Sequence, residues 1–164
     1  MAAPYVVSAE ELETVETLIG RDLGPTEWFE IEQARVDDFA DSALDRHWIH
    51  NEPEVAARGP FGGAIAHAHL TLALMPWFGR ALIAFEDGEA SLFYGYDRVR
   101  FPAPVPVGAR IRARGVVRDA RRASGAVQLS VEIRVEIEDA DRPACVAVAL
   151  WRHYPLELFN HDAL

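Results

Sequence analysis

The second half of the chain alternates apolar and polar residues with a period of two, and this pattern constrains the fold more than any other feature. Along Val107–Val117 small and branched apolar residues alternate with arginines, and along Val127–Ile137 they alternate with Gln, Glu and Arg. Successive side chains of a β-strand point to opposite faces, so each stretch predicts a strand with one buried face. Leu92–Phe101 and the more apolar Cys145–Trp151 predict two further strands. The turn-forming residues between three of these stretches favour antiparallel hairpins.

A helical pattern precedes these strands. From about His67 the apolar residues recur at helical spacing, and in the first turns they lie on nearly every side. A helix without a polar face is buried. We therefore expect the sheet to wrap around a long central helix that is kinked near Pro76. Together the elements predict an α+β fold with an antiparallel sheet wrapped around that helix.

The N-terminal residues predict shorter elements. Ser8, followed by two glutamates, has the pattern of an N-cap for an amphipathic helix that ends at Gly20. Trp28–Glu32 alternates like a strand, and Gln33–Leu44 predicts a second helix. Because no internal repeat or linker composition is visible, we expect residues 1–164 to form a single domain, of which 1–25 are an N-terminal helical extension.

Composition narrows the possible partners. The net charge is -10, and the excess lies in residues 1–60, which hold 14 acidic and 4 basic side chains. Such a surface repels nucleic acid. The basic residues are all arginines, so lysine-based Schiff-base chemistry is excluded. Cys145 is the sole cysteine, and no stretch has the pattern of a membrane span or a signal peptide. We therefore expect no membrane association and a cytoplasmic location.

The densest group of polar residues begins at Asp45. Residues 45–63 contain many Gly, Pro and Asn residues, and we expect an ordered loop there. Asp45 and His50 would lie about 140° apart on a continuous helix, so they face each other only if the chain leaves the helix. A carboxylate opposite an imidazole can hold and deprotonate a water molecule, which is what hydration and dehydration require. Such pairs also occur in loops for purely structural reasons.

Three segments carry a family resemblance. They are Asp45–Glu54 (DRHWIHNEPE), Gly59–His67 (GPFGGAIAH) and Tyr94–Val105 (YGYDRVRFPAPV). In these motifs the chain resembles the MaoC-like, R-specific enoyl-CoA hydratase family, which has a hot-dog fold. The resemblance implies a hydro-lyase that adds water to trans-2-enoyl thioesters, such as enoyl-CoA, to give (R)-3-hydroxyacyl thioesters, or that catalyses the reverse dehydration.

The resemblance also assigns roles to individual positions. Asp45 and His50 match the two catalytic positions that hold the water. The family's His-Gly pair at the start of the central helix corresponds to His67 and Ala68, and the backbone N–H of Ala68 takes the place of the glycine N–H that binds the thioester carbonyl. Alanine keeps this donor, but its methyl group restricts how closely the thioester approaches. The substrate-binding residues that the resemblance implies are His47, Gly63, Ala68 and Phe101.

Alternative interpretations stay open. The histidine spacing matches no standard zinc pattern, so we expect no metal, and no cofactor apart from the coenzyme A of the substrate. The arginines between residues 98 and 122 suit either the phosphates of coenzyme A or the solvated face of a strand. The alternative functions are a dehydratase for acyl-carrier-protein thioesters, a thioesterase on the same fold, and a non-catalytic acyl-thioester-binding subunit. We expect a homodimer, because a second copy is the simplest cover for an open sheet edge.

Overall fold

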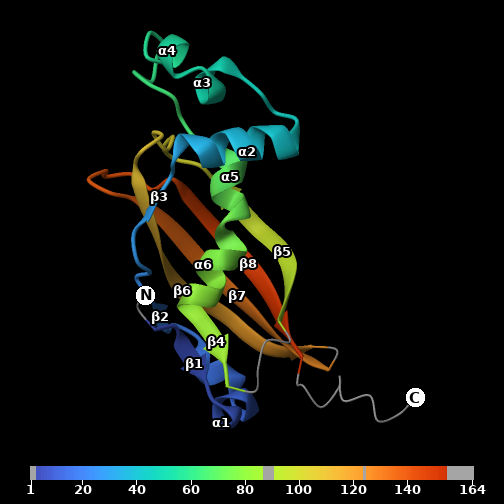
Figure 1. Ribbon diagram of the computed structural model, residues 1–164. Helices are drawn as coiled ribbons and strands as arrows, with labels where there is room; N and C mark the ends of the chain where they lie inside the picture. The colour runs from blue at the N-terminus through green and yellow to red at the C-terminus, as the bar shows by residue number, and fades with distance from the viewer. Residues whose placement is uncertain (1–2, 87–90, 124, 155–164) are drawn as a thin grey trace.

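An antiparallel sheet forms the centre of the protein (Figure 1). The computed structural model describes residues 3–86, 91–123 and 125–154. The strand order is β2-β6-β7-β8-β5, and the short β3 also pairs with β6. The strands of this sheet are β2 (Asp22–Leu23), β3 (Phe29–Glu30), β5 (Ser91–Arg100), β6 (Arg110–Ala123), β7 (Ala126–Ile137) and β8 (Cys145–His153).

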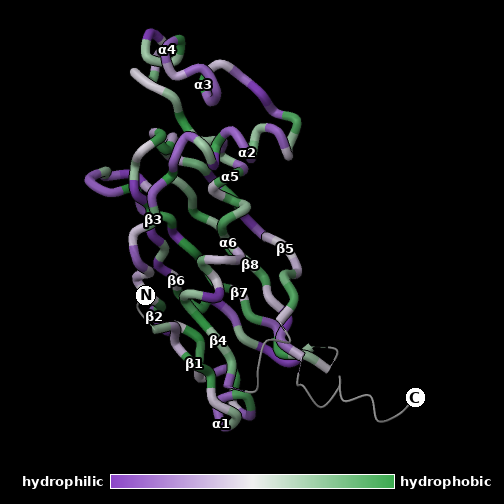
Figure 2. The backbone as a smooth tube through the Cα atoms, in the orientation of Figure 1, coloured by the Kyte–Doolittle hydropathy of each residue, from purple (hydrophilic) through white to green (hydrophobic). Residues whose placement is uncertain are grey.

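The period-two pattern accounts for the long strands. On β6, Ile111 and Val117 are fully buried. On the opposite face Arg112 pairs with Glu136 of β7, with 2.7 Å between Nε and Oε2. In Figure 2 hydrophobic and hydrophilic segments follow one another along these strands. The four expected strands are thus confirmed, with different ends.

β6 and β3 depart furthest from their expected ranges. β6 begins at Arg110 and not at Val107, because Gly108 adopts a positive φ of 85° that interrupts extended backbone. It also continues beyond Val117 to Ala123, because its pairing with β7 extends to Ala123 and Ala126 at the hairpin end. The strand expected over Trp28–Glu32 is reduced to the two residues of β3.

The central helix consists of α5 (Ala68–Ala73) and α6 (Met75–Leu82), and the sheet curves around it (Figure 1). Phe78 is fully buried in the core that α6 shares with the strands. The kink expected near Pro76 is confirmed. Proline has no N–H to donate to the carbonyl of Leu72, four residues earlier. The hydroxyl of Tyr96 on β5 donates to that carbonyl instead, at 3.2 Å, so the break in the helix leaves this acceptor satisfied.

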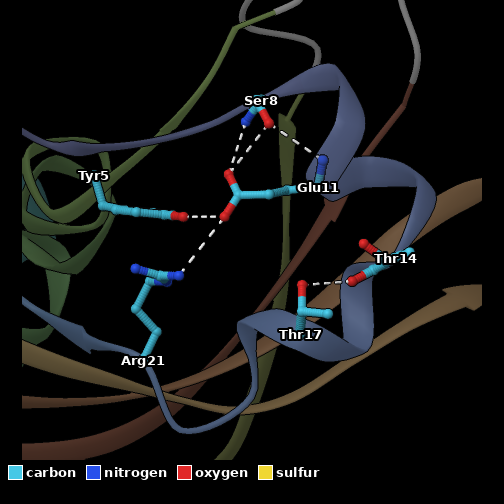
Figure 3. A network of polar contacts seen from close by, with 6 residues as sticks. All are labelled: Tyr5, Ser8, Glu11, Thr14, Thr17 and Arg21. Carbon is cyan, nitrogen blue, oxygen red and sulfur yellow. Dashed lines mark hydrogen bonds and ion pairs between the residues drawn. The ribbon is translucent and has the colours of Figure 1, made fainter.

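The N-terminal extension contains strands as well as helices. Its elements are β1 (Tyr5–Val7), α1 (Ala9–Glu13), the 3₁₀ helix η1 (Val15–Leu18) and β2, and β1 pairs in parallel with β4 (Ile83–Phe85). The cap at Ser8 is confirmed, because Ser8 and Glu11 form a reciprocal capping box (Figure 3). The same carboxylate accepts the hydroxyl of Tyr5 and faces Arg21 at 3.7 Å.

The single helix expected up to Gly20 is wrong, because the chain breaks at Thr14, whose φ is -127° and ψ is 54°. The carbonyl of Thr14 instead accepts the hydroxyl of Thr17 at 2.7 Å (Figure 3). This break turns Val15 and Leu18 into the core, where both are buried.

The helix expected over Gln33–Leu44 is confirmed as α2 (Gln33–Ala43). The loop expected over residues 45–63 is wrong in part, because two short helices form there, α3 (Trp48–Asn51) and α4 (Pro53–Ala56). His47 caps α3 by accepting the N–H of Ile49, and Pro53 occupies the first turn of α4, where its missing N–H costs nothing. Over the described ranges 3–86, 91–123 and 125–154, no helix combines the length and apolar composition that a membrane crossing requires.

Candidate active site

Asp45 leaves the helix that precedes it through one left-handed residue. α2 ends at Ala43, and Leu44 adopts φ 55° and ψ 34°. The N–H of Asp45 then donates to the carbonyl of Ala40 at 2.9 Å, which closes the helix end. The side chain of Asp45 is exposed and lies outside the helix, while His50 lies on α3. The exit from the helix that the spacing required is therefore confirmed.

His50 is held in one tautomer by the backbone. Its side chain is buried, at 9% exposure, and its Nδ1 lies 2.6 Å from the carbonyl oxygen of Ile65. A carbonyl oxygen can only accept a hydrogen bond, so Nδ1 carries the proton. The other ring nitrogen, Nε2, then keeps its lone pair. This arrangement leaves Nε2 of His50 able to accept a proton.

The environment favours the neutral form of His50. Burial lowers its pKa from the ordinary value, and this effect exceeds the opposing influence of the hydrogen bond to Ile65. The neighbouring His67 and His47 lower the pKa further, whereas the charge of Asp45 raises it. The charge of Asp45 therefore acts on His50. At neutral pH the imidazole is unprotonated and can accept a proton.

We expect the folded protein to lose stability as the pH falls. Because the pKa of His50 lies below its ordinary value of 6.5, the unfolded chain takes up a proton more readily than the folded one in this range. The contribution of His50 to the free energy of unfolding is complete above about pH 6.5 and is lost as the pH falls toward the folded pKa. Urea unfolding between about pH 7.5 and pH 5 measures this loss, and His50→Gln should make it smaller. An unchanged pH dependence in His50→Gln would contradict the assignment.

A pocket of about 380 Å³ adjoins His50. It lies between the start of α5 and the segment after β5, and it is lined largely by apolar residues. Ala68 and Phe101, both expected to bind substrate, also line it. Ala68 is the first residue of α5, where backbone N–H groups have no partner within the helix. The pocket therefore combines a neutral base with a helix N-terminus.

Three of the expected site residues lie outside this pocket lining. Asp45 acts on His50 through its charge, as described above. His47 caps α3 through Nδ1, at 3.4 Å from the backbone nitrogen of Ile49, and its ring centroid lies 6.3 Å from that of His50. Gly63 lies in the bend before Ala64, and nothing lies within 4 Å of where a Cβ would project. The structure thus gives His47 a capping role and leaves open space where a side chain on Gly63 would project.

The site also contains residues that the sequence did not single out. The carbonyl of Ile65 orients His50, and the buried Thr71 lines the pocket. Thr71 lies three residues after Ala68, so helical spacing from Ala68 would have identified it. No such signal exists for Ile65, because its contribution comes from the backbone. Within the described parts of the chain, no group of three or more His, Cys, Asp or Glu side chains is arranged to hold a metal ion.

Comparison with known proteins identifies the family. Residues 14–140 match the family model described as MaoC like domain. The chain is 43% identical over 135 residues to 3-hydroxyacyl-thioester dehydratase Z of Mycobacterium tuberculosis (strain H37Rv), covering 82% of this chain and 89% of that protein. It is 40% identical over 139 residues to Nodulation protein N of Rhizobium meliloti, covering 83% of this chain and 86% of the relative.

Solved structures show the same fold. The (R)-hydratase from A. caviae involved in PHA biosynthesis superposes with a TM-score of 0.68 at 22% identity, over 82% of this chain and 96% of that one. The MaoC-like dehydratase from Rhodospirillum rubrum superposes with a TM-score of 0.69 at 16% identity, over 84% and 92% of the two chains. At these identities the likeness shows the hot-dog fold alone. The family match, in contrast, covers most of the sequence, and the chain belongs to the MaoC-like dehydratase family.

Proposed function

We propose that the protein is a hydro-lyase that adds water to trans-2-enoyl thioesters, with enoyl-CoA as substrate, to give (R)-3-hydroxyacyl thioesters, and that catalyses the reverse dehydration. The observation that carries the proposal is a pocket lined by His50, whose Nε2 is unprotonated, and by Ala68 at the start of α5. Asp45 acts on His50 through its charge from outside the pocket lining. The name of the M. tuberculosis relative, a 3-hydroxyacyl-thioester dehydratase, supports this reaction class.

Each group has a separate task in the hydration direction. Asp45 orients the water molecule, and Nε2 of His50 accepts its proton while the oxygen attacks C3 of the enoyl group. The electrons of the C2–C3 double bond move toward the thioester carbonyl, whose oxygen gains negative charge. The N–H of Ala68 donates to that oxygen. The proton then returns from the Asp45–His50 pair to C2, so that one water molecule has been added and no cofactor is consumed.

A single assay panel tests the proposal. Purified protein is incubated with crotonyl-CoA and longer trans-2-enoyl-CoA thioesters without added metal, and both enoyl absorbance and free thiol are followed. We expect enoyl absorbance to fall with no release of thiol, and the chirality of the product to be (R). Release of thiol would identify a thioesterase. Turnover only of acyl-carrier-protein thioesters would identify the carrier-protein dehydratase, and binding without turnover would identify a non-catalytic subunit.

A homodimer is part of the proposal. β5 is the last strand in the sheet order, and it exposes large apolar side chains, with Leu92 61% and Tyr94 57% exposed. A second copy that pairs along β5 would cover this edge. We expect light scattering to give twice the mass of one chain, and a Leu92→Glu, Tyr94→Glu double variant to give the mass of one chain. A monomeric wild-type protein would contradict this part of the proposal.

We also propose a cytoplasmic location, with which the free thiol of Cys145 is compatible. It is buried, and burial raises its pKa to about 12. A thiol with such a pKa stays protonated and is a poor nucleophile. Cys145 is therefore a core residue and takes no part in the reaction.

A further inference from the structure

His67 makes a direct contact with the backbone of the proposed catalytic carboxylate residue. It lies just before α5 and is 2% exposed. Its Nε2 lies 2.9 Å from the carbonyl oxygen of Asp45, although the two residues are 22 positions apart. Because a carbonyl oxygen only accepts, Nε2 carries the proton of the ring. This hydrogen bond ties the exit from α2 to the start of the central helix.

The same ring packs against the proposed base. The ring centroids of His67 and His50 lie 3.7 Å apart, and their planes are inclined by 27°. The ring of Phe39 lies 5.1 Å from the His67 centroid. His67 therefore contacts both partners of the proposed catalytic pair, Asp45 through its edge and His50 through its face.

The two ring nitrogens of His67 have different surroundings. Among the residues that the structure describes, Nδ1 is buried and has no hydrogen-bond partner, whereas Nε2 donates to Asp45. A proton on Nδ1 would leave a buried donor without an acceptor, which is costly. The tautomer with its proton on Nε2 accounts for the geometry around both nitrogens.

We propose that His67 is a positioning residue that holds the backbone of Asp45 with its Nε2–H and shields the ring of His50 from water with its face. This inference rests on the proposed hydration reaction for its kinetic consequences. The contacts themselves make a prediction that is independent of the reaction, which is the tautomer of each of the two rings.

Two substitutions separate the two contacts. His67→Phe keeps an aromatic face against His50 but removes the donor to Asp45. It should lower kcat by roughly 10- to 100-fold with little change in KM, because Asp45 loses its orientation. His67→Gln keeps an N–H donor but removes the ring, which admits water to His50. The pKa of His50 then rises toward its ordinary value, so the acid limb of the kcat/KM profile moves to higher pH.

A control variant shows whether a loss of stability by itself could cause the kinetic changes in the His67 variants. Met75→Ala removes a fully buried side chain of α6 that does not line the pocket, and it should lower the melting temperature without moving the pH profile. His67→Phe with wild-type kcat would overturn the contact to Asp45 as a positioning element. His67→Gln with an unchanged acid limb would overturn the shielding of His50.

A measurement on the wild-type protein keeps the inference testable if the variants do not fold. Imidazole ¹⁵N resonances, recorded at about pH 8, report the tautomer of each ring. We expect the ring of His67 to carry its proton on Nε2 and the ring of His50 to carry its proton on Nδ1. A proton on Nδ1 of His67 would overturn the inference. A protein with these tautomers but without hydratase activity would refute the proposed function and leave the contacts established.

Discussion

Asp45→Asn and His50→Gln are each expected to lower kcat for enoyl-CoA hydration by about 10²- to 10⁴-fold, the usual contribution of a positioned acid or base. Asn cannot accept a proton at neutral pH, so the water is no longer activated by a charged partner. Gln can donate to the carbonyl of Ile65 from its amide, but it offers no base in place of Nε2. Steady-state kinetics with crotonyl-CoA measures both losses.

The matched control for these substitutions is Asp41→Asn. Asp41 is also an exposed carboxylate near the end of α2, but it is paired with Arg46. Exposed pairs of this kind contribute little to stability, so this variant should keep wild-type turnover. The melting temperatures of all three variants establish whether they are folded. Folded Asp45→Asn and His50→Gln proteins that retain wild-type hydration would refute the proposed mechanism.

Ala68→Pro is expected to lower kcat by about 10²- to 10³-fold, the cost of losing one donor to a developing oxyanion. Ala68 is the first residue of α5, and the preceding His67 has φ -60° and ψ 136°. Proline is well tolerated at the first helical position, and its predecessor prefers this extended conformation. The substitution therefore removes the N–H and leaves the helix intact.

Two further substitutions at Ala68 separate the effect of losing the N–H donor from the effect of side-chain size. Ala68→Val adds bulk similar to that of proline but keeps the N–H, and Ala68→Gly removes the methyl group and keeps the N–H. Both should retain most of kcat, although KM changes if the methyl group limits the approach of the thioester. If Ala68→Pro and Ala68→Val have equal kcat, the N–H has no part in catalysis and the loss is steric.

Much of the fold follows from local pattern. The alternation along β6 specifies which face of that strand is buried, because a shift by one residue would move its arginines into the core. On β7 the alternation holds from Glu132 onward, but Gln128 and Ser130 are also buried, so the expectation of one buried face is wrong for the first half of β7. Pro76 marks the kink in the central helix because proline lacks an N–H wherever it occurs. Local pattern did not give the ends of every helix. Thr14 breaks the N-terminal helix, and two short helices form after Asp45. Those ends depend on which residues the core buries.

The sequence by itself determined the kinds of chemical group available: a carboxylate, several imidazoles and a helix start, in a spacing that resembles a known family. The tertiary structure alone decided which of them act together. It placed His50, Ala68 and Phe101 around one pocket, and it placed His47 outside the lining of that pocket, as the cap of α3. The carbonyl of Ile65 and the ring of His67 fix the tautomer and the burial of His50. The physical reason is that these contacts join backbone and side chains of residues separated along the chain, and hydrophobic periodicity carries no information about such pairs.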